Sequence, residues 1–102
     1  MSKRKIEILA AAWRELEEIA QYHLLMVGPI SAKKITDRLL DAIERLEEFP
    51  LSSPHVADSE LQSQDYRMLI CEKYVCIYRL LCDTVFIYHI AHTSTEYTNL
   101  MK

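Results

Sequence analysis

The hydrophobic residues of this chain change their spacing halfway along the sequence, from a helical repeat to the short apolar runs of strands. One helix face is predicted by apolar residues at intervals of three and four: Ala32, Ile35, Leu39, Ala42, Leu46 and Phe49. After residue 65 the chain is rich in Tyr, Val, Ile and Cys, in runs separated by two-residue gaps. Helices followed by strands predict an α+β fold, and 102 residues predict a single domain over 1–102.

The first half is predicted to hold a short N-terminal strand and a pair of helices. Residues 5–9 alternate polar and apolar side chains, as in a strand. The first helix is expected over residues 10–27, and Ser31 is expected to cap a second helix that ends at Pro50. Because Gly28-Pro29 leaves only a short connection, the helices should form an antiparallel hairpin. The strand-rich second half favours packing within the chain over a coiled-coil dimer.

The second half is predicted to form a three-strand antiparallel meander. A polar loop over residues 50–65, with a short helical turn near 58–61, leads into it. The strands are expected at 66–71, 74–81 and 84–92, joined by two-residue turns. Side chains of the middle strand alternate between two faces, and both faces are largely apolar. The polar tail over 93–102 is predicted to form a short terminal helix.

Composition and charge exclude several classes of protein. A single glycine, Gly28, excludes phosphate-binding glycine loops, and no nucleotide or other cofactor is expected. The formal net charge is −3, whereas dedicated nucleic-acid binders usually carry a basic excess. Three cysteines without a C-x-x-C motif predict reduced thiols in a cytoplasmic protein. No apolar run approaches the ~20 residues that span a bilayer, so no membrane association is expected.

The order of these elements, together with several residue runs, resembles the RelE/ParE superfamily, the toxins of bacterial type II toxin–antitoxin modules. The first helix matches in the run that begins Ala11-Ala12-Trp13, and the last strand matches in Val85 to His92. The remaining runs are the end of the second helix and the central hairpin, residues 42–50, 66–70 and 74–80. The resemblance covers nearly the whole chain and implies the same α+β fold.

The resemblance also implies a toxin that inhibits growth when free, by one of two mechanisms. RelE-like members cleave messenger RNA in the ribosomal decoding site, using basic residues and a tyrosine or histidine on the open face of the sheet. ParE-like members share the fold without that nuclease set and inhibit DNA gyrase. Both kinds are silenced by a cognate antitoxin. The implied partners are therefore an antitoxin, in a toxin–antitoxin hetero-oligomer, and either DNA gyrase or the ribosome with its mRNA.

Two departures from the RelE-like pattern favour the ParE-like mechanism. Val75 stands where the nucleases carry the arginine that stabilises the scissile phosphate, and valine cannot perform that role. Where many relatives have adjacent arginines, the tail reads Thr93-Ser94-Thr95. The negative net charge also favours the ParE-like mechanism. We therefore predict a ParE-like gyrase inhibitor, with a reduced RelE-like nuclease and a non-toxic, antitoxin-binding module as alternatives.

The resemblance assigns candidate site residues for either mechanism. If the chain is a nuclease, Arg67, His92 and Tyr97 are the expected catalytic residues. Arg67, Lys73 and Arg79 are expected to bind the substrate or target. Each also has a structural interpretation: the arginines as partners of carboxylates, with Glu7 or Asp83 proposed for Arg79, and Tyr97 as a ring packed on the core.

Two other groups of residues are expected to have no binding role. His89 and His92 lie three apart on a predicted strand and face opposite sides, so no metal site is expected. The remaining group is an acidic surface on the helix pair that is expected to be a solvated face: Glu15, Glu17, Glu18, Glu44, Glu47 and Glu48.

Overall fold

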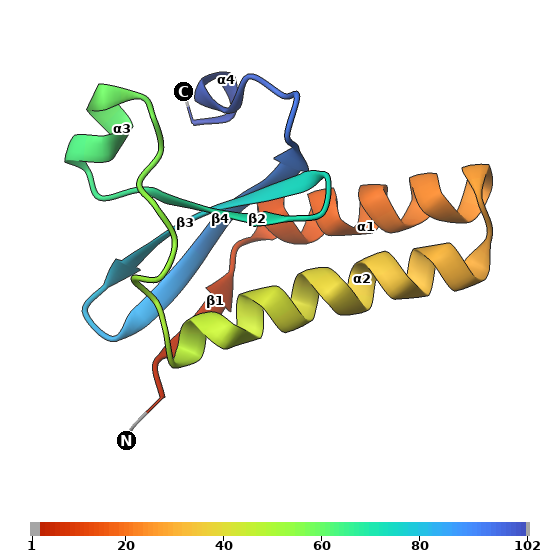
Figure 1. Ribbon diagram of the computed structural model, residues 1–102, viewed down its shortest axis with the longest axis horizontal. Helices are drawn as coiled ribbons and strands as arrows, with labels where there is room; N and C mark the ends of the chain where they lie inside the picture. The colour runs from red at the N-terminus through yellow and green to blue at the C-terminus, as the bar shows by residue number, and fades with distance from the viewer. Residues whose placement is uncertain (1–2, 102) are drawn as a thin grey trace.

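The computed structural model describes residues 3–101 and places two long helices against one face of a four-stranded sheet (Figure 1). The first half contains β1 (Lys5–Ile8), α1 (Ala10–Met26), α2 (Pro29–Glu44) and the 3-10 turn η1 (Arg45–Glu47). The second half contains α3 (Ser59–Ser63), β2 (Arg67–Cys71), β3 (Tyr74–Leu81), β4 (Thr84–His92) and α4 (Tyr97–Leu100). The predicted α+β fold, with its helix hairpin and three-strand meander, is thus confirmed.

The turn between α1 and α2 is set by Gly28. Its φ of 136° lies in a region that L side chains rarely adopt, and Pro29 then occupies the first position of α2. The prediction that Ser31 caps this helix is wrong, because α2 begins two residues earlier. Ser31 instead lies in the first turn, where its Oγ is 2.9 Å from Nδ1 of His23.

The strands are ordered β1-β4-β3-β2. The meander pairs β2 with β3 and β3 with β4 antiparallel, while β1 pairs with β4 in parallel. Opposite the step from Ile77 to Tyr78, β4 carries one additional residue, Tyr88, because Ile77 pairs with His89 and Tyr78 with Ile87. This β-bulge changes the direction in which the end of β4 presents its side chains.

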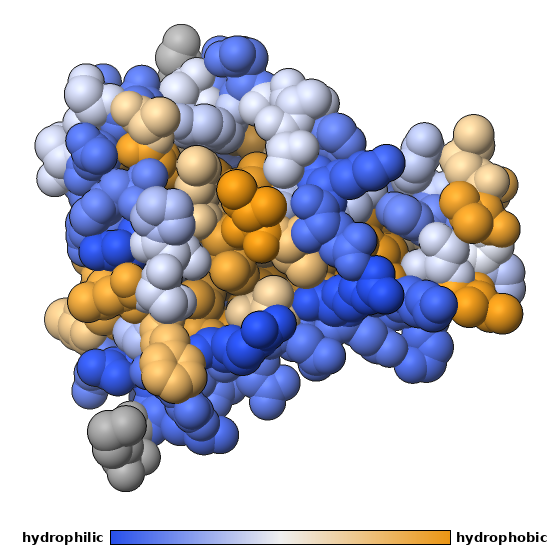
Figure 2. Space-filling model, viewed as in Figure 1, coloured by the Kyte–Doolittle hydropathy of each residue, from blue (hydrophilic) through white to orange (hydrophobic). Residues whose placement is uncertain are grey.

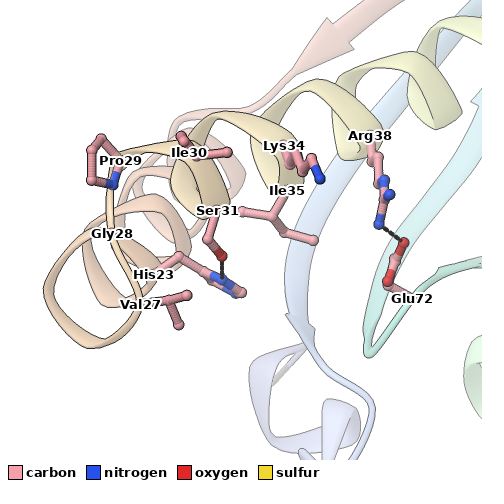
Figure 3. Close-up of a pocket in the computed structure, with 10 residues that line it drawn as sticks. All are labelled: His23, Val27, Gly28, Pro29, Ile30, Ser31, Lys34, Ile35, Arg38 and Glu72. Atoms are coloured by element: carbon pink, nitrogen blue, oxygen red, sulfur yellow. Dashed lines mark hydrogen bonds and ion pairs between the residues drawn. The ribbon is translucent and has the colours of Figure 1, made fainter.

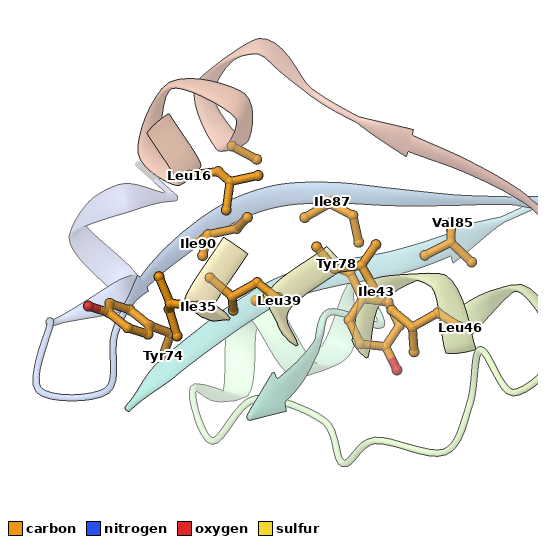
Figure 4. Packing of buried hydrophobic residues seen from close by; sticks show 12 residues of the cluster. Leu16, Ile35, Leu39, Ile43, Leu46, Tyr74, Tyr78, Val85, Ile87 and Ile90 are labelled. Carbon is orange, nitrogen blue, oxygen red and sulfur yellow. The ribbon is translucent and has the colours of Figure 1, made fainter. Parts of the chain in front are cut away.

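The main core lies between the helix pair and the sheet (Figure 4). Apolar side chains of α1, α2 and η1 meet those of β3 and β4. The larger members are Leu16, Ile35, Leu39, Ile43, Leu46, Tyr74, Tyr78, Val85, Ile87 and Ile90. The predicted α2 stripe therefore faces the core, except at its end. Phe49 was expected on that stripe but is 59 % exposed, because the chain leaves the helix at Glu44 and turns through η1 before reaching it.

A second, smaller cluster covers the opposite face of the sheet. Val75 and Ile77 of β3 are buried there beneath Val56 and Tyr66. Partly buried side chains from α3, β2, β4 and the C-terminal segment complete the cover: Leu61, Met68, Tyr88, Tyr97 and Met101. In Figure 1, α3 and α4 lie on the side of the sheet away from α1 and α2.

Candidate functional site

Arg67 fastens the loop after η1 to the sheet. Its Nη1 donates to the carbonyl of Ser53 at 2.7 Å and approaches that of Leu51 at 3.4 Å. Its Nη2 lies 3.9 Å from Asp65 Oδ1, and the same carboxylate oxygen lies 2.6 Å from Nε2 of His55. The guanidinium is thus directed to backbone carbonyls of its own chain.

Tyr97 holds the start of α3 in place. Its hydroxyl oxygen accepts hydrogen bonds from the backbone N–H groups of Ala57 at 3.1 Å and Asp58 at 3.2 Å. Asp58 in turn caps α3, because its carboxylate accepts from the N–H of Leu61. The ring packs on the small cluster that contains buried Val75.

Arg79 packs against two tyrosine rings that contact each other edge-on, and not against Glu7 or Asp83 as its structural interpretation expected. Its guanidinium carbon is 4.5 Å from the ring centroid of Tyr66 and 5.4 Å from that of Tyr88. Nε donates to the Tyr88 hydroxyl at 2.9 Å, and Nη1 lies 3.3 Å from the carbonyl of Gln64. Cation–π contact therefore replaces an ion pair at this position. Burial is the main reason that the pKa of Tyr66 is raised, and Arg79 opposes that shift.

His92 and Lys73 lie together at the other end of the sheet. Arg67 pairs with Tyr78 and His92 pairs with Tyr74, which separates the two positions by roughly 13 Å along β3. His92 accepts from the N–H of Ser94 at 3.1 Å, and its ring meets that of Tyr74 edge-on. The structure thus gathers Lys73 and His92 but leaves Arg67 distant from them.

A groove of about 610 Å³ opens beside His92. Its lining combines Lys73, His92 and Tyr74 with side chains of α1 such as Glu18 and Tyr22. An anion bound there would meet both the ammonium and the imidazole, as well as carboxylates that oppose its charge.

A second cavity, of about 510 Å³, lies at the tip of the helix hairpin (Figure 3). His23 separates it from the first groove, since its Nδ1 lies 2.9 Å from Ser31 Oγ and its Nε2 lies 3.0 Å from the Tyr74 hydroxyl. The polar side chains of the cavity include Arg38 and Glu72, which form an ion pair with each other.

A family model describing the ParE toxin of the type II toxin–antitoxin system parDE matches residues 6–97. The chain belongs to the ParE toxin family. No curated protein matches its sequence significantly.

Solved structures share the fold of this ParE-family toxin. The chromosomal ParDE system from P. aeruginosa aligns with a TM-score of 0.75 at 15 % identity, covering 88 % of this chain and 96 % of that one. The toxin–antitoxin complex RelBE2 from Mycobacterium tuberculosis aligns with a TM-score of 0.66 at 19 % identity, covering 90 % of this chain and 93 % of that one.

Within the described residues, no helix is long and apolar enough to span a bilayer.

One contact between the helix pair and the sheet of this ParE-family toxin was missed by the sequence analysis. Glu15 was assigned to a solvated face, but its carboxylate accepts from the N–H of Ile90 at 3.0 Å. Both carboxylate oxygens also lie 3.1 Å from Nδ1 of His89. Glu15 lies three residues after buried Ala12 and four before Ile19, which places it beside the apolar face of the helix, and this spacing was the available signal.

Proposed function

We propose that this chain is the growth-inhibiting toxin of its module and that it acts on DNA gyrase without cleaving RNA. The observation that carries the proposal is the apolar cover over the sheet face that RelE-like nucleases leave open to RNA. Val75, the residue in place of their phosphate-binding arginine, is only 5 % exposed beneath that cover. A nuclease needs preorganised cations where charge develops on the phosphate. Around Val75 this face presents alkyl groups and rings, and the nearby guanidinium of Arg79 is held against Tyr66 and Tyr88.

The contacts of the candidate residues support the same proposal. Arg67 binds backbone carbonyls, Arg79 packs against the rings of Tyr66 and Tyr88, and the Tyr97 hydroxyl accepts two backbone N–H groups. Each would have to release these partners before it could act on a substrate, which opposes a role in phosphodiester cleavage.

An antitoxin is the partner expected to silence the toxin. Support comes from the family match and from the two solved relatives, a ParDE system and a RelBE2 toxin–antitoxin complex. We propose that a small protein encoded beside this gene binds the chain and restores growth.

Induced expression in a bacterial host, with and without that neighbouring gene, tests the proposal. DNA synthesis should fall before protein synthesis, and the purified chain should inhibit supercoiling by DNA gyrase. Arg67→Ala and Tyr97→Phe proteins that remain folded should retain this inhibition. Ribosome-dependent RNA cleavage that either substitution abolishes would overturn the proposal in favour of the nuclease. Unchanged growth would instead favour a non-toxic, antitoxin-binding module.

The groove beside His92 favours one alternative. Lys73 and His92 line it together, so a reduced nuclease would use this pair as cation and acid–base group. In that case His92→Gln should abolish toxicity while leaving antitoxin binding intact, whereas the gyrase mechanism predicts toxicity close to that of the unmodified chain.

A further inference from the structure

The outer edge of β2 is covered along only half of its length. In the first half, the Met68 N–H donates to the carbonyl of Pro54 at 3.0 Å. The Val56 N–H donates to the carbonyl of Tyr66 at 3.1 Å, and His55 forms an isolated bridge with Arg67. The loop after η1 therefore occupies this part of the edge as a short additional strand.

The second half of the edge, at Ile70, is open. Successive residues of a strand direct their backbone groups to opposite sides, so the outward N–H of Met68 implies an outward N–H and carbonyl at Ile70. Within residues 3–101 neither group has a backbone partner outside the β2–β3 ladder. Exposed strand edges are usually protected by charge, proline or a covering segment. Ile70 has none of these protections and is 59 % exposed.

An apolar groove of about 320 Å³ runs beside this open edge. Its lining includes Leu46, Phe49, Leu69 and Ile70, together with Arg45. Phe49 and the adjacent Leu51 are more than half exposed. Figure 2 shows hydrophobic surface where Figure 1 draws β2 and again near the end of α2. The edge and the groove together offer backbone hydrogen bonds and apolar contact to the same ligand.

We propose that an extended segment of the antitoxin binds here by adding a short strand to β2 at Ile70. The identity of this partner rests on the proposed function. The free N–H and carbonyl of Ile70 are complementary to a peptide backbone, which an added strand supplies. Alternate side chains of that strand would point into the groove, so the segment carries an apolar residue there. Arg45 is the one charged residue of the described lining. It favours a carboxylate on the residue of the added strand that lies next to it.

A second copy of this chain fits the edge less well. Pairing of two β2 strands about Ile70 would bring the turn of one copy against Met68 of the other. The loop at Pro54 already occupies that position through its hydrogen bond to the Met68 N–H. A short, separate peptide segment can end before Pro54, whereas a second folded chain cannot.

Amide hydrogen exchange tests the proposal with the product of the neighbouring gene as the probe. The two proteins are co-expressed, and exchange at Ile70 is measured by NMR in the complex and in the toxin refolded alone. In the complex, the Ile70 N–H should exchange at least about tenfold more slowly, since a protected amide must open before it exchanges. The amide of Leu69, which faces β3, serves as the internal reference.

A pair of substitutions separates the backbone contact from the side chain. Ile70→Pro removes the outward N–H, which an edge strand tolerates, while Ile70→Val keeps it. Binding should weaken at least about tenfold for Ile70→Pro and stay within about threefold for Ile70→Val, as expected for one hydrogen bond. The Ile70→Pro protein enters the comparison only if its circular dichroism spectrum matches that of the unmodified chain. The hydrogen-exchange measurement does not depend on this variant and tests the proposal by itself.

The outcomes distinguish this inference from the function on which it rests. If the neighbouring protein does not bind the unmodified chain, the antitoxin partnership fails and the inference fails with it. If the complex forms but Ile70 exchanges as fast as in the free toxin, only the inference is overturned. Leu25 is exposed at the tip of the helix hairpin. If Leu25→Lys weakens binding and Ile70→Pro does not, the antitoxin binds at the hairpin tip and the inference is overturned.

Discussion

At the scale of single residues, Glu15 is one of the polar side chains that join the helix layer to the sheet. Its carboxylate accepts from the N–H of Ile90, a buried residue just after the bulge at Tyr88. The N–H of Ile90 points away from β3, on the side of β4 where β1 has already ended, so a side chain from the packed helix satisfies it in place of a strand. Glu15 therefore stabilises the irregular part of β4 that precedes His92.

Replacing Glu15 by Ala should lower the free energy of unfolding by about 1–3 kcal/mol, because the buried Ile90 N–H loses its acceptor. Glu17→Ala is the matched control, since Glu17 is exposed on the same helix, and it should change stability by less than about 0.5 kcal/mol. Urea titration followed by circular dichroism measures both. Equal effects of the two substitutions would contradict the assignment.

The cysteines should differ sharply in reactivity. Burial raises the pKa of the Cys76 thiol to about 12, whereas Cys82 is exposed. A thiol reagent at pH 8 should label Cys82 rapidly and reach Cys76 only after unfolding, because the thiolate is the nucleophile. The unfolded Cys76 thiol loses its proton at lower pH than the folded one, so its contribution to stability should decline as pH rises from about 9 to about 12. A Cys82→Ser protein that keeps the rapid phase would contradict this.

At the scale of elements, the two hairpin turns adopt a backbone shape that their residues do not favour. Glu72 has φ of 59° and Cys82 has φ of 55°, each at the first position of a two-residue turn. Such turns match the twist of the strands and usually carry Gly or Asn at positive φ. The pairing of β3 with its neighbours thus imposes the turn geometry against local preference.

Cys82→Gly should raise the free energy of unfolding by about 0.5–1 kcal/mol. Glycine removes the cost of roughly 1–2 kcal/mol for an L residue at positive φ, and part of that gain is offset by the greater freedom of the unfolded chain. Asp83→Gly, one residue later and without positive φ, should instead destabilise the protein. Thermal denaturation of both proteins measures the difference, and a lower melting temperature for Cys82→Gly would refute the argument.

At the scale of the whole molecule, the negative charge opposes binding to nucleic acid. The formal net charge is −3, and carboxylates of the helix pair lie on the surface. Affinity for phosphate backbones comes largely from counterion release by clustered cations.

We expect no measurable binding of single-stranded RNA at micromolar protein in about 150 mM salt. As a control, exposed Glu17, Glu18 and Glu48 are replaced by Lys. Each replacement changes the charge by +2, so the formal net charge rises from −3 to +3. This variant should bind RNA with strong salt dependence in a fluorescence anisotropy titration. Salt-dependent binding by the unmodified chain, lost with Lys73→Ala, would support the nuclease alternative.

Local patterns predicted the elements well, and contacts between distant segments account for what was missed. The apolar repeat gave the core face of α2, and alternation gave both faces of β3. Phe49 was misplaced because periodicity cannot show where a helix tightens into a 3-10 turn. Glu15 and Arg79 were misassigned because their partners, Ile90 and the two tyrosines, are set by the register of the sheet. The role of Arg67, His92 and Tyr97 as a functional set stays a prediction.

The parallel pairing of β1 with β4 has a consequence for how the chain matures. Lys5 pairs with Thr84, so during synthesis β1 has no partner until β4, the last of the described strands, has emerged. The helix hairpin can form early, but its apolar face is buried only after the sheet has formed. The apolar faces of β1 and of the helix hairpin therefore stay uncovered for most of translation, and the core closes only when β4 has been made.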